Sequence, residues 1–396
     1  TLARKILSKR PTGYGDTDIT ELNPELKKYE NINLKIGNTE LQISPLIITV
    51  FIGVLLLLIA LLPPIIHWIN PLYEQDLFLG FQLMGYRESI NHPGLIIGPY
   101  GLGAALLSLL FPLSLAFSIG LYYRLKSASI IKIRDKTRKL EDEFSSALFQ
   151  LANRLGDGTP AETAFVKVAA IMKDTVSGKF FELVATNITK LGMSVKEAIF
   201  NQRTGALTFF SSEVIKSSMK VLVESVKKGP RIASQAILNV ARYIKEIHRV
   251  NERLKDLLAE IISDIKSQIT FMTPAIAGIV IGITSMITYI LSTLATNIQK
   301  LGTSGVGAQI AQISSMFGDG LPTYQFQLVV GVYIFEIIYI LTILANGIEN
   351  GEDKLQEKYL LGQNLLRSTV LYVMIAFVVM LIFNLIASKI TTVVGV

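Results

Sequence analysis

The residue types that most often carry chemistry are sparse in this chain of 396 residues. It has no cysteine, and its three histidines, His67, His92 and His248, lie far apart. Cysteine nucleophiles, thiolate metal sites and disulfides are therefore excluded, and a metal site built from histidines is not expected. We interpret His248 as an ordinary residue of a helix face, because a lone histidine rarely has a catalytic role.

Sequence motifs that bind nucleotides or activate water do not occur either. A phosphate-binding loop places glycines before a lysine and a hydroxyl residue, and the glycine-rich stretch Gly302 to Gly307 lacks that lysine. The His-Glu-x-x-His pattern of zinc proteases and the Gly-x-Ser-x-Gly pattern of hydrolases are absent from the sequence. We therefore expect no enzyme, with no catalytic residues, no cofactor and no metal.

One set of residues with a shared chemistry is basic. Its members are Lys227, Lys228, Arg231, Arg242, Lys245, Arg249 and Arg253. The last four recur at spacings of three and four, so they share one face of a helix. Such a face could bind an acidic cytoplasmic partner or anionic lipid headgroups, and a simply solvated face is an equally good interpretation. Nucleic acid is disfavoured, because no aromatic side chains alternate with these cations.

A single acid, Glu336, interrupts a long apolar window. A charge at the centre of a membrane helix costs roughly 2.5–3.5 kcal/mol on insertion scales, so we expect Glu336 to face protein. It could form an ion or proton site. It could also form an interhelical hydrogen bond to the hydroxyl of Thr284, Ser285 or Tyr339, and this second interpretation is favoured.

The composition is that of a membrane protein. Hydrophobic residues make up 50% of the chain and charged residues 17%, and the mean hydropathy is +0.46. The windows long enough for the roughly 20 apolar residues of a spanning helix are 41–73, 89–123, 267–299, 320–348 and 368–388. We expect an all-α polytopic protein with five transmembrane helices, in which Pro63 and Pro64 kink or end the first.

Lysine and arginine are distributed unevenly between the spans. Segments 1–44, 124–268 and 348–367 carry 35 of them, and the outer loops with the C-terminus carry 3. The bias remains without the long segment, since 10 still oppose 3. The positive-inside rule then places these three segments, including the N-terminus, in the cytoplasm.

Four parts of the chain follow from these spans. They are a cytoplasmic tail or linker at 1–44, two transmembrane helices with a short outer loop at 45–123, a basic cytoplasmic helical bundle at 124–268, and three transmembrane helices with a short cytoplasmic loop (348–367) at 269–396. The tail has no signal-peptide pattern. Because residue 1 is threonine, we expect the chain to be processed or to begin inside a longer one.

The basic block at 124–268 reads as helix nearly throughout, with a net charge of +9. Phe144, Leu148, Leu151 and Leu155 form an apolar stripe on a helix that runs from about Lys132 to Gly156. Further helices are expected to start at Thr159, after Gly178, at Ser194, at Phe209 and at about Arg231. Thr159 and Ser194 are each followed three residues later by glutamate, the spacing of a capping box. The last helix has no breaker before the third span and would continue into it.

Several segments of this block and beyond it have sequences typical of one family. They are Glu143 to Leu155, Gly158 to Phe165, Gly205 to Leu207, Glu224 to Pro230 and Asn346 to Lys354. They resemble the type II secretion system F domain, which is found in the inner-membrane platform proteins of type IV pili, type II secretion and archaella. The last three resemble archaeal platform proteins more closely. The resemblance covers about 130–390 and rests on helix-core patterns rather than catalytic signatures.

This resemblance implies a non-enzymatic scaffold in the cytoplasmic membrane. Such a protein docks a hexameric secretion ATPase on its cytoplasmic domain, to which we assign the seven basic residues, and helps to extrude pilin-like subunits. We expect it to contact membrane lipid and to form a homo-oligomer, a dimer. The family often has two cytoplasmic domains, so either the first lay upstream of Thr1 or this is a short form.

A transporter or ion-coupled membrane protein that uses Glu336 is the alternative. Transporters usually show paired broken helices and several polar residues within the membrane, and this sequence offers one acid. A sensory receptor would need an outer ligand-binding domain, for which the outer loops are too short.

Overall fold

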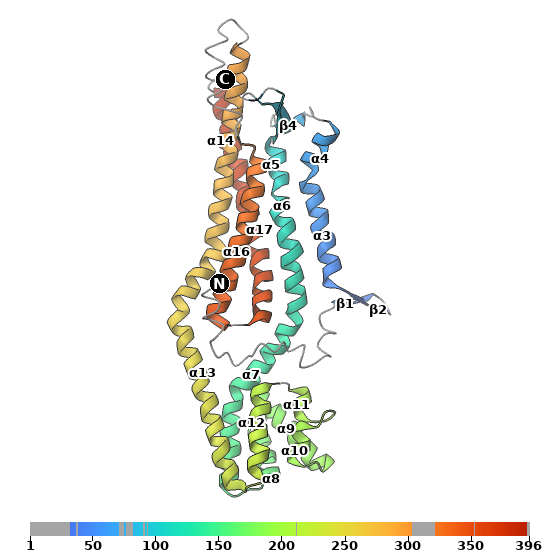
Figure 1. Cartoon of the computed structure of the whole chain (residues 1–396), viewed down its shortest axis with the longest axis vertical. Coiled ribbons are helices and arrows are strands. Elements are labelled where there is room, and N and C mark those ends of the chain that lie inside the picture. Colours follow the sequence, from blue (N-terminus) through green and yellow to red (C-terminus); the bar gives the residue numbers. More distant parts are fainter. Residues whose placement is uncertain are drawn as a thin grey trace. The chain divides into compact units, whose positions relative to one another are not determined.

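The computed structural model of the chain contains two compact units, which we describe separately (Figure 1). The residues described are 32–36, 39–70, 75–76, 82–89, 92, 94–210, 212–302, 321–351 and 353–393. One unit, the membrane unit, comprises Asn31–Ser127 and Ile261–Val396. The other, the helical domain, comprises Ala128–Glu260.

The membrane unit is mainly helical, as the apolar windows predict. Its helices are α3 (Pro45–Ala60), α4 (Leu62–Ile69), α5 (Leu102–Ser108), α6 (Leu110–Leu115), the π-helical segments η2 (Ala116–Leu121) and η3 (Gln268–Met272), α14 (Thr273–Gly302), α16 (Thr323–Asn350) and α17 (Lys354–Val393). Four helical stretches are long and apolar enough to cross a membrane, or five if the bent pair α3–α4 counts as one span. The chain is therefore a multi-pass membrane protein of the α-helical class.

The first span breaks where its prolines predict. Helix α3 ends at Ala60, and α4 continues after Leu61 at an angle of 52°. Pro63 lies in the first turn of α4, where its missing N–H removes no helical hydrogen bond. The bend is held from outside the helix, because the hydroxyl of Tyr86 donates to the carbonyl of Pro63 at 2.8 Å.

Five short strands were not expected in this unit. Strands β1 (Ile32–Ile36) and β2 (Thr39–Ile43) form an antiparallel hairpin, and β3 (Gln75–Asp76), β4 (Gln82–Glu88) and β5 (Ile96–Tyr100) form an antiparallel sheet. The expected helical window 89–123 therefore begins with a strand, and its helix starts only at Leu102. Gly98, Pro99 and Gly101 disfavour a helix in the first part of this window. The prediction missed this because an apolar run by itself does not distinguish a strand from a helix.

Small residues bring the spanning helices close together. Helices α14 and α17 lie side by side (Figure 1), and a Cβ built on Gly278 would meet Ile375 at 2.8 Å. A Cβ on Gly282 would collide with Val379, and one on Gly362 would lie 2.5 Å from the carbonyl oxygen of Gly120. Contacts of this kind are how membrane helices gain packing energy without a hydrophobic driving force.

The expected loop at 348–367 is mostly helix. Helix α16 ends at Asn350 and α17 begins at Lys354, so the basic residues of this segment lie on α17. Asp353 stops one helix and starts the next: its carboxylate accepts from the backbone N–H of Gln356 at 2.9 Å, and its carbonyl accepts from Asn346 at 3.1 Å. Polar residues also occupy helix ends, so the sequence alone did not show that the helices extend into this segment.

The helical domain is built from seven helices in its described residues. They are α7 (Tyr122–Gly156), α8 (Ala161–Ile171), α9 (Val176–Leu191), α10 (Val195–Phe200), α11 (Ala206–Phe209), α12 (Glu213–Val226) and α13 (Pro230–Ser267), of which α7 and α13 also extend into the membrane unit. The predicted stripe Phe144, Leu148, Leu151 and Leu155 is fully buried in one apolar core. Its centre is aromatic, with ring centroids of neighbouring phenylalanines 5.4–6.0 Å apart.

Helix starts in the domain agree only in part with the sequence prediction. Ser194 and Glu197 form the predicted capping box. Thr159 does not cap α8, which Pro160 precedes without a side-chain cap. Helix α9 starts before Gly178, because the hydroxyl of Thr175 accepts from the N–H of Gly178 at 2.9 Å.

The helix predicted to begin at Phe209 begins instead at Glu213, as α12, and Phe209 is the last residue of the preceding helix, α11. Ser212 caps α12, since its hydroxyl accepts from the N–H of Ile215 at 3.2 Å. The same hydroxyl donates to the carboxylate of Glu141 on α7. This tertiary hydrogen bond adds to the local cap at the start of α12, and the bond itself cannot be read from the local sequence.

The chain passes between its two units as helix both times. Helical structure is continuous from Pro230 through η3 into α14, as predicted. It is also continuous from Leu102 to Gly156, so the helix expected from about Lys132 begins further upstream.

Candidate functional site

All seven predicted basic residues are exposed in the helical domain. Lys227 and Lys228 follow the end of α12, and Arg231 lies in the first turn of α13. With a rise of 1.5 Å per residue, Arg242 lies about 17 Å further along α13 and Arg253 about 33 Å. The seven residues therefore form a strip that runs from the end of α12 along α13, which we call the basic strip, and not one compact cluster.

The basic strip lies away from the core because the opposite side of α13 is anchored. Ala233, Ile237, Ala241 and Ile244 are buried at spacings of three and four. The hydroxyl of Ser234 also donates to the carbonyl of Ala152 on α7 at 2.7 Å. At 100° per residue, the strip residues from Arg242 to Arg253 point about 130° from this buried stripe.

Acidic neighbours pair with only part of the basic strip. Lys227 lies 3.0 Å from Glu224 and lowers the pKa of that carboxyl through a hydrogen bond and its charge. Arg249 lies 3.8 Å from Glu246. Within the described residues, the other strip cations form no ion pair. They are Lys228, Arg231, Arg242, Lys245 and Arg253. Unpaired and exposed cations of this kind attract acidic surfaces at long range.

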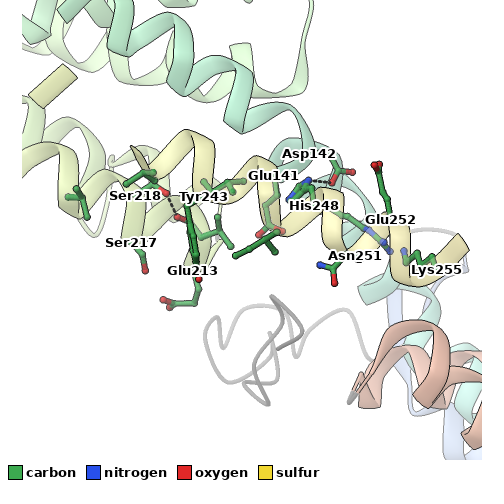
Figure 2. A pocket seen from close by; sticks show the side chains of 16 residues that line it. Glu141, Asp142, Glu213, Ser217, Ser218, Tyr243, His248, Asn251, Glu252 and Lys255 are labelled. Atoms are coloured by element: carbon green, nitrogen blue, oxygen red, sulfur yellow. Dashed lines mark hydrogen bonds and ion pairs between the residues drawn. The ribbon is translucent and has the colours of Figure 1, made fainter. Parts of the chain in front are cut away.

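A groove of about 770 Å³ lies between α7, α12 and α13 of the helical domain (Figure 2). Its apolar lining includes Val214 and Val221 of α12 and Val240, Tyr243 and Ile247 of α13. The spacing of the last three follows a helical period and was readable from the sequence. The sequence did not show that α7 contributes to the groove, because only the tertiary fold places α7 beside α12 and α13.

Charged side chains also line this groove. Four are carboxylates (Glu141, Asp142, Glu213 and Glu252), and two are cations (Arg138 and Lys255). His248 also lines the groove, half-buried, with its Nδ1 3.5 Å from the carboxylate of Asp142 (Figure 2). The groove is therefore acidic within a domain of net positive charge.

Glu336 does not face the interior of the chain, so the structure does not contain the predicted hydrogen bond to Thr284, Ser285 or Tyr339. Helix α16 buries Ile334 and Ile338, and a side chain two residues from a buried position points to the opposite side. The predicted hydroxyl partners have other bonds: Ser285 accepts from Asn384 at 2.9 Å and Thr284 donates to the carbonyl of Val280 at 2.8 Å. Tyr339 is itself exposed.

Other polar residues occupy the interior of the membrane unit instead. The hydroxyl of Ser108 donates to the amide oxygen of Gln327 at 2.8 Å, which joins α5 to α16. The amide of Asn364 donates to Thr342 at 3.1 Å and joins α17 to α16. Ser108, Gln327 and Thr342 interrupt apolar windows and were therefore visible in the sequence, whereas Asn364 lies outside those windows.

Comparisons of the chain with protein-family models, with curated proteins and with solved structures found no match. Among the described residues, no group of three histidine, aspartate or glutamate side chains could hold a metal ion. The fold defines the class: a multi-pass α-helical membrane protein that carries a separate helical domain.

Proposed function

We propose that this chain is the membrane platform of a type IV pilus, archaellum or type II secretion-like machine. It docks a cytoplasmic hexameric secretion ATPase on its helical domain and couples the motion of that ATPase to the extrusion of pilin-like subunits. The proposal starts from the resemblance of its sequence segments to the type II secretion system F domain family. It places the helical domain in the cytoplasm, on the side that the distribution of lysine and arginine favours.

The observation that carries the proposal is the continuous helix from Pro230 to Gly302. Its first part presents the basic strip, and its last part is an apolar membrane span. The chain passes from the strip to the span without a loop, and in this proposal the force applied at the strip reaches the bilayer along that helical connection.

The last turn of α13 forms an ion pair with a second spanning helix, α16. The ammonium group of Lys266 lies 2.7 Å from the carboxylate of Glu349, near the end of α16. Movement of α13 would therefore act on α16 as well as on α14. In a platform, these are the helices that would shift beside entering pilin-like subunits.

The test is co-purification of a secretion ATPase from the same source with charge-reversed variants. Replacing Arg242, Lys245, Arg249 and Arg253 by glutamate should abolish co-purification and leave the fold intact, because all four side chains are exposed. The matched control replaces four exposed lysines elsewhere in the domain, Lys167, Lys190, Lys196 and Lys220, by glutamate. Unchanged binding in the first variant, or equal loss in both, would contradict the proposed docking surface.

The orientation can be tested separately. The chain has no cysteine, so single cysteines introduced at Thr163 and in segment 303–320 report sidedness through a membrane-impermeant maleimide. We expect Thr163→Cys to react only after the membrane is opened, and a cysteine in 303–320 to react in intact cells. The reverse pattern would place the helical domain outside and remove the ATPase from consideration.

The alternative, an ion-coupled transporter, has less support. It requires Glu336 to line a path within the bundle, whereas this carboxylate lies on the exposed side of α16. An exposed acid at this depth is better explained by contact with another membrane helix. A second copy of the chain would supply one, in line with the proposed dimer.

A further inference from the structure

One face of α13 within the helical domain is apolar and largely exposed. Its six residues follow one another at alternating spacings of three and four, and we call them the apolar seam: Val240, Tyr243, Ile247, Val250, Leu254 and Leu257. Tyr243, Val250 and Leu257 are 67%, 54% and 78% exposed, and the other three are partly covered. A second helix along this seam, which is about 26 Å long at 1.5 Å per residue, would gain hydrophobic energy in proportion to the area buried.

The apolar seam is distinct from the two other faces of α13. At 100° per residue, it points about 105° from the buried stripe that anchors α13 to the core and about 125° from the basic strip. The seam therefore neither forms the core of the domain nor shares a residue with the basic strip. A partner helix on the seam would leave the basic strip open.

The spacing of the seam is that of a coiled coil. Val240, Ile247 and Leu254 recur every seven residues, as the a positions of a heptad, and Tyr243, Val250 and Leu257 recur as its d positions. Two of the three a residues are β-branched, which favours two parallel strands. In a parallel pair of α13 helices, the flanking g and e positions would place Glu246 opposite the partner's Asn251 and Arg253 opposite the partner's Leu258, so no like charges meet.

Insertion in the membrane aligns two copies of the chain in this way. Helix α13 continues through η3 into the spanning helix α14, so copies with the same topology direct their α13 helices alike. Because the copies are identical, equivalent residues lie at the same distance from the bilayer, and a meets a and d meets d. Confinement to one membrane also raises the effective concentration of the copies, which a short seam needs.

We propose that a second copy of this chain covers the apolar seam, and that the two α13 helices form a parallel, in-register coiled coil. This deepens the dimer of the proposed function by naming the surface that forms it, and it rests on that function only for the dimer. It does not depend on the ATPase.

Disulfide formation in the naturally cysteine-free chain tests the contact. We expect Tyr243→Cys, Val250→Cys and Leu257→Cys each to join two copies at the same position when membranes are oxidised, as measured by a product of twice the chain mass. The control is Asp256→Cys, which is exposed on the far side of α13. Equal yield from this control, or no product from the seam, would overturn the proposal. So would a product that joins Tyr243→Cys of one copy to Leu257→Cys of another, because the helices would then be antiparallel.

Substitutions in the seam test what holds the two copies together. Val250→Glu with Leu257→Glu should reduce the dimer fraction in sedimentation about tenfold and leave the helix content unchanged, because the dimer would bury unpaired carboxylates. The matched control places glutamate at two exposed apolar positions of α8, Val166 and Ile171. An equal loss in this control would contradict the proposed surface.

A second variant should act in the opposite direction. Tyr243→Leu with Val250→Leu should raise the dimer fraction, since leucine at d positions favours two-stranded coils. No gain would contradict the heptad assignment. Co-purification of the ATPase is measured separately through the basic strip, so a seam that fails while the ATPase still binds overturns this inference alone.

Discussion

Lys266 and Glu349 form an ion pair of 2.7 Å that joins the last turn of α13 to the last turns of α16. Both side chains are partly exposed, at 49% and 30%, and lie 83 positions apart in the chain. The pair therefore connects the last turn of the helix that carries the basic strip to α16, which is not the span that directly follows that helix in sequence.

Breaking this ion pair should reduce the transmission of ATPase motion to filament assembly more than it reduces the stability of the folded protein. We expect Lys266→Met to lower thermal stability in detergent by no more than about 1 kcal/mol, because partly exposed pairs contribute little. If the pair transmits force, filament assembly should fall while ATPase co-purification is retained. The charge swap Lys266→Glu with Glu349→Lys is the matched control, and assembly that stays low in the swap would argue against a role for the pair.

Ser212→Ala should destabilise the helical domain. The substitution removes the cap of α12, which costs about 1 kcal/mol, and deprives the mostly buried carboxylate of Glu141 of a donor, which costs about 1–3 kcal/mol more. Denaturant unfolding followed by circular dichroism measures the change. Ser217→Ala, an exposed position on the same helix, should be nearly neutral.

Gly282→Val should separate α14 from α17. The added side chain would collide with Val379, and overpacking of this kind costs about 1–3 kcal/mol. Thermal unfolding in detergent should show the loss. Ile283→Val, at the next position and on the exposed side, is the control, and equal effects of the two changes would contradict the observed packing.

Substitutions of Glu336 distinguish the proposed platform function from the alternative, an ion-coupled transporter. Under the proposed function, Glu336→Gln should retain filament assembly, because an amide can still form hydrogen bonds to a partner helix. Glu336→Leu should weaken self-association, measured by sedimentation in detergent. Loss of a pH-dependent ion flux in proteoliposomes of the Gln variant would instead favour the transporter.

Tyr86 should make stability sensitive to strong alkali. Burial, with a smaller contribution from Tyr324, raises the pKa of Tyr86 from 10.0 to about 12. The folded state therefore favours the neutral hydroxyl, whose donation to Pro63 contributes stability below pH 10 that is lost as the pH rises toward 12. Tyr86→Phe should remove this part of the pH dependence. An unchanged alkaline profile would contradict the assignment.

The sequence by itself determined the class of the protein and much of its local structure. Apolar windows of spanning length, the stripe from Phe144 to Leu155, the break at Pro63 and the capping box at Ser194 all follow from periodicity and backbone chemistry within a few turns. These features depend on residues that are close in sequence, so they can be predicted from the sequence alone.

Tertiary structure alone decided the rest. The outward position of Glu336, the hydrogen bond from Ser212 to Glu141 and the acidic groove each depend on which faces of distant helices meet. Glu141 and Ser212 are 71 positions apart, and the groove joins residues from three helices. Burial and hydrogen bonding between such segments act through space, and a helix buries whichever stripe of its surface finds a partner.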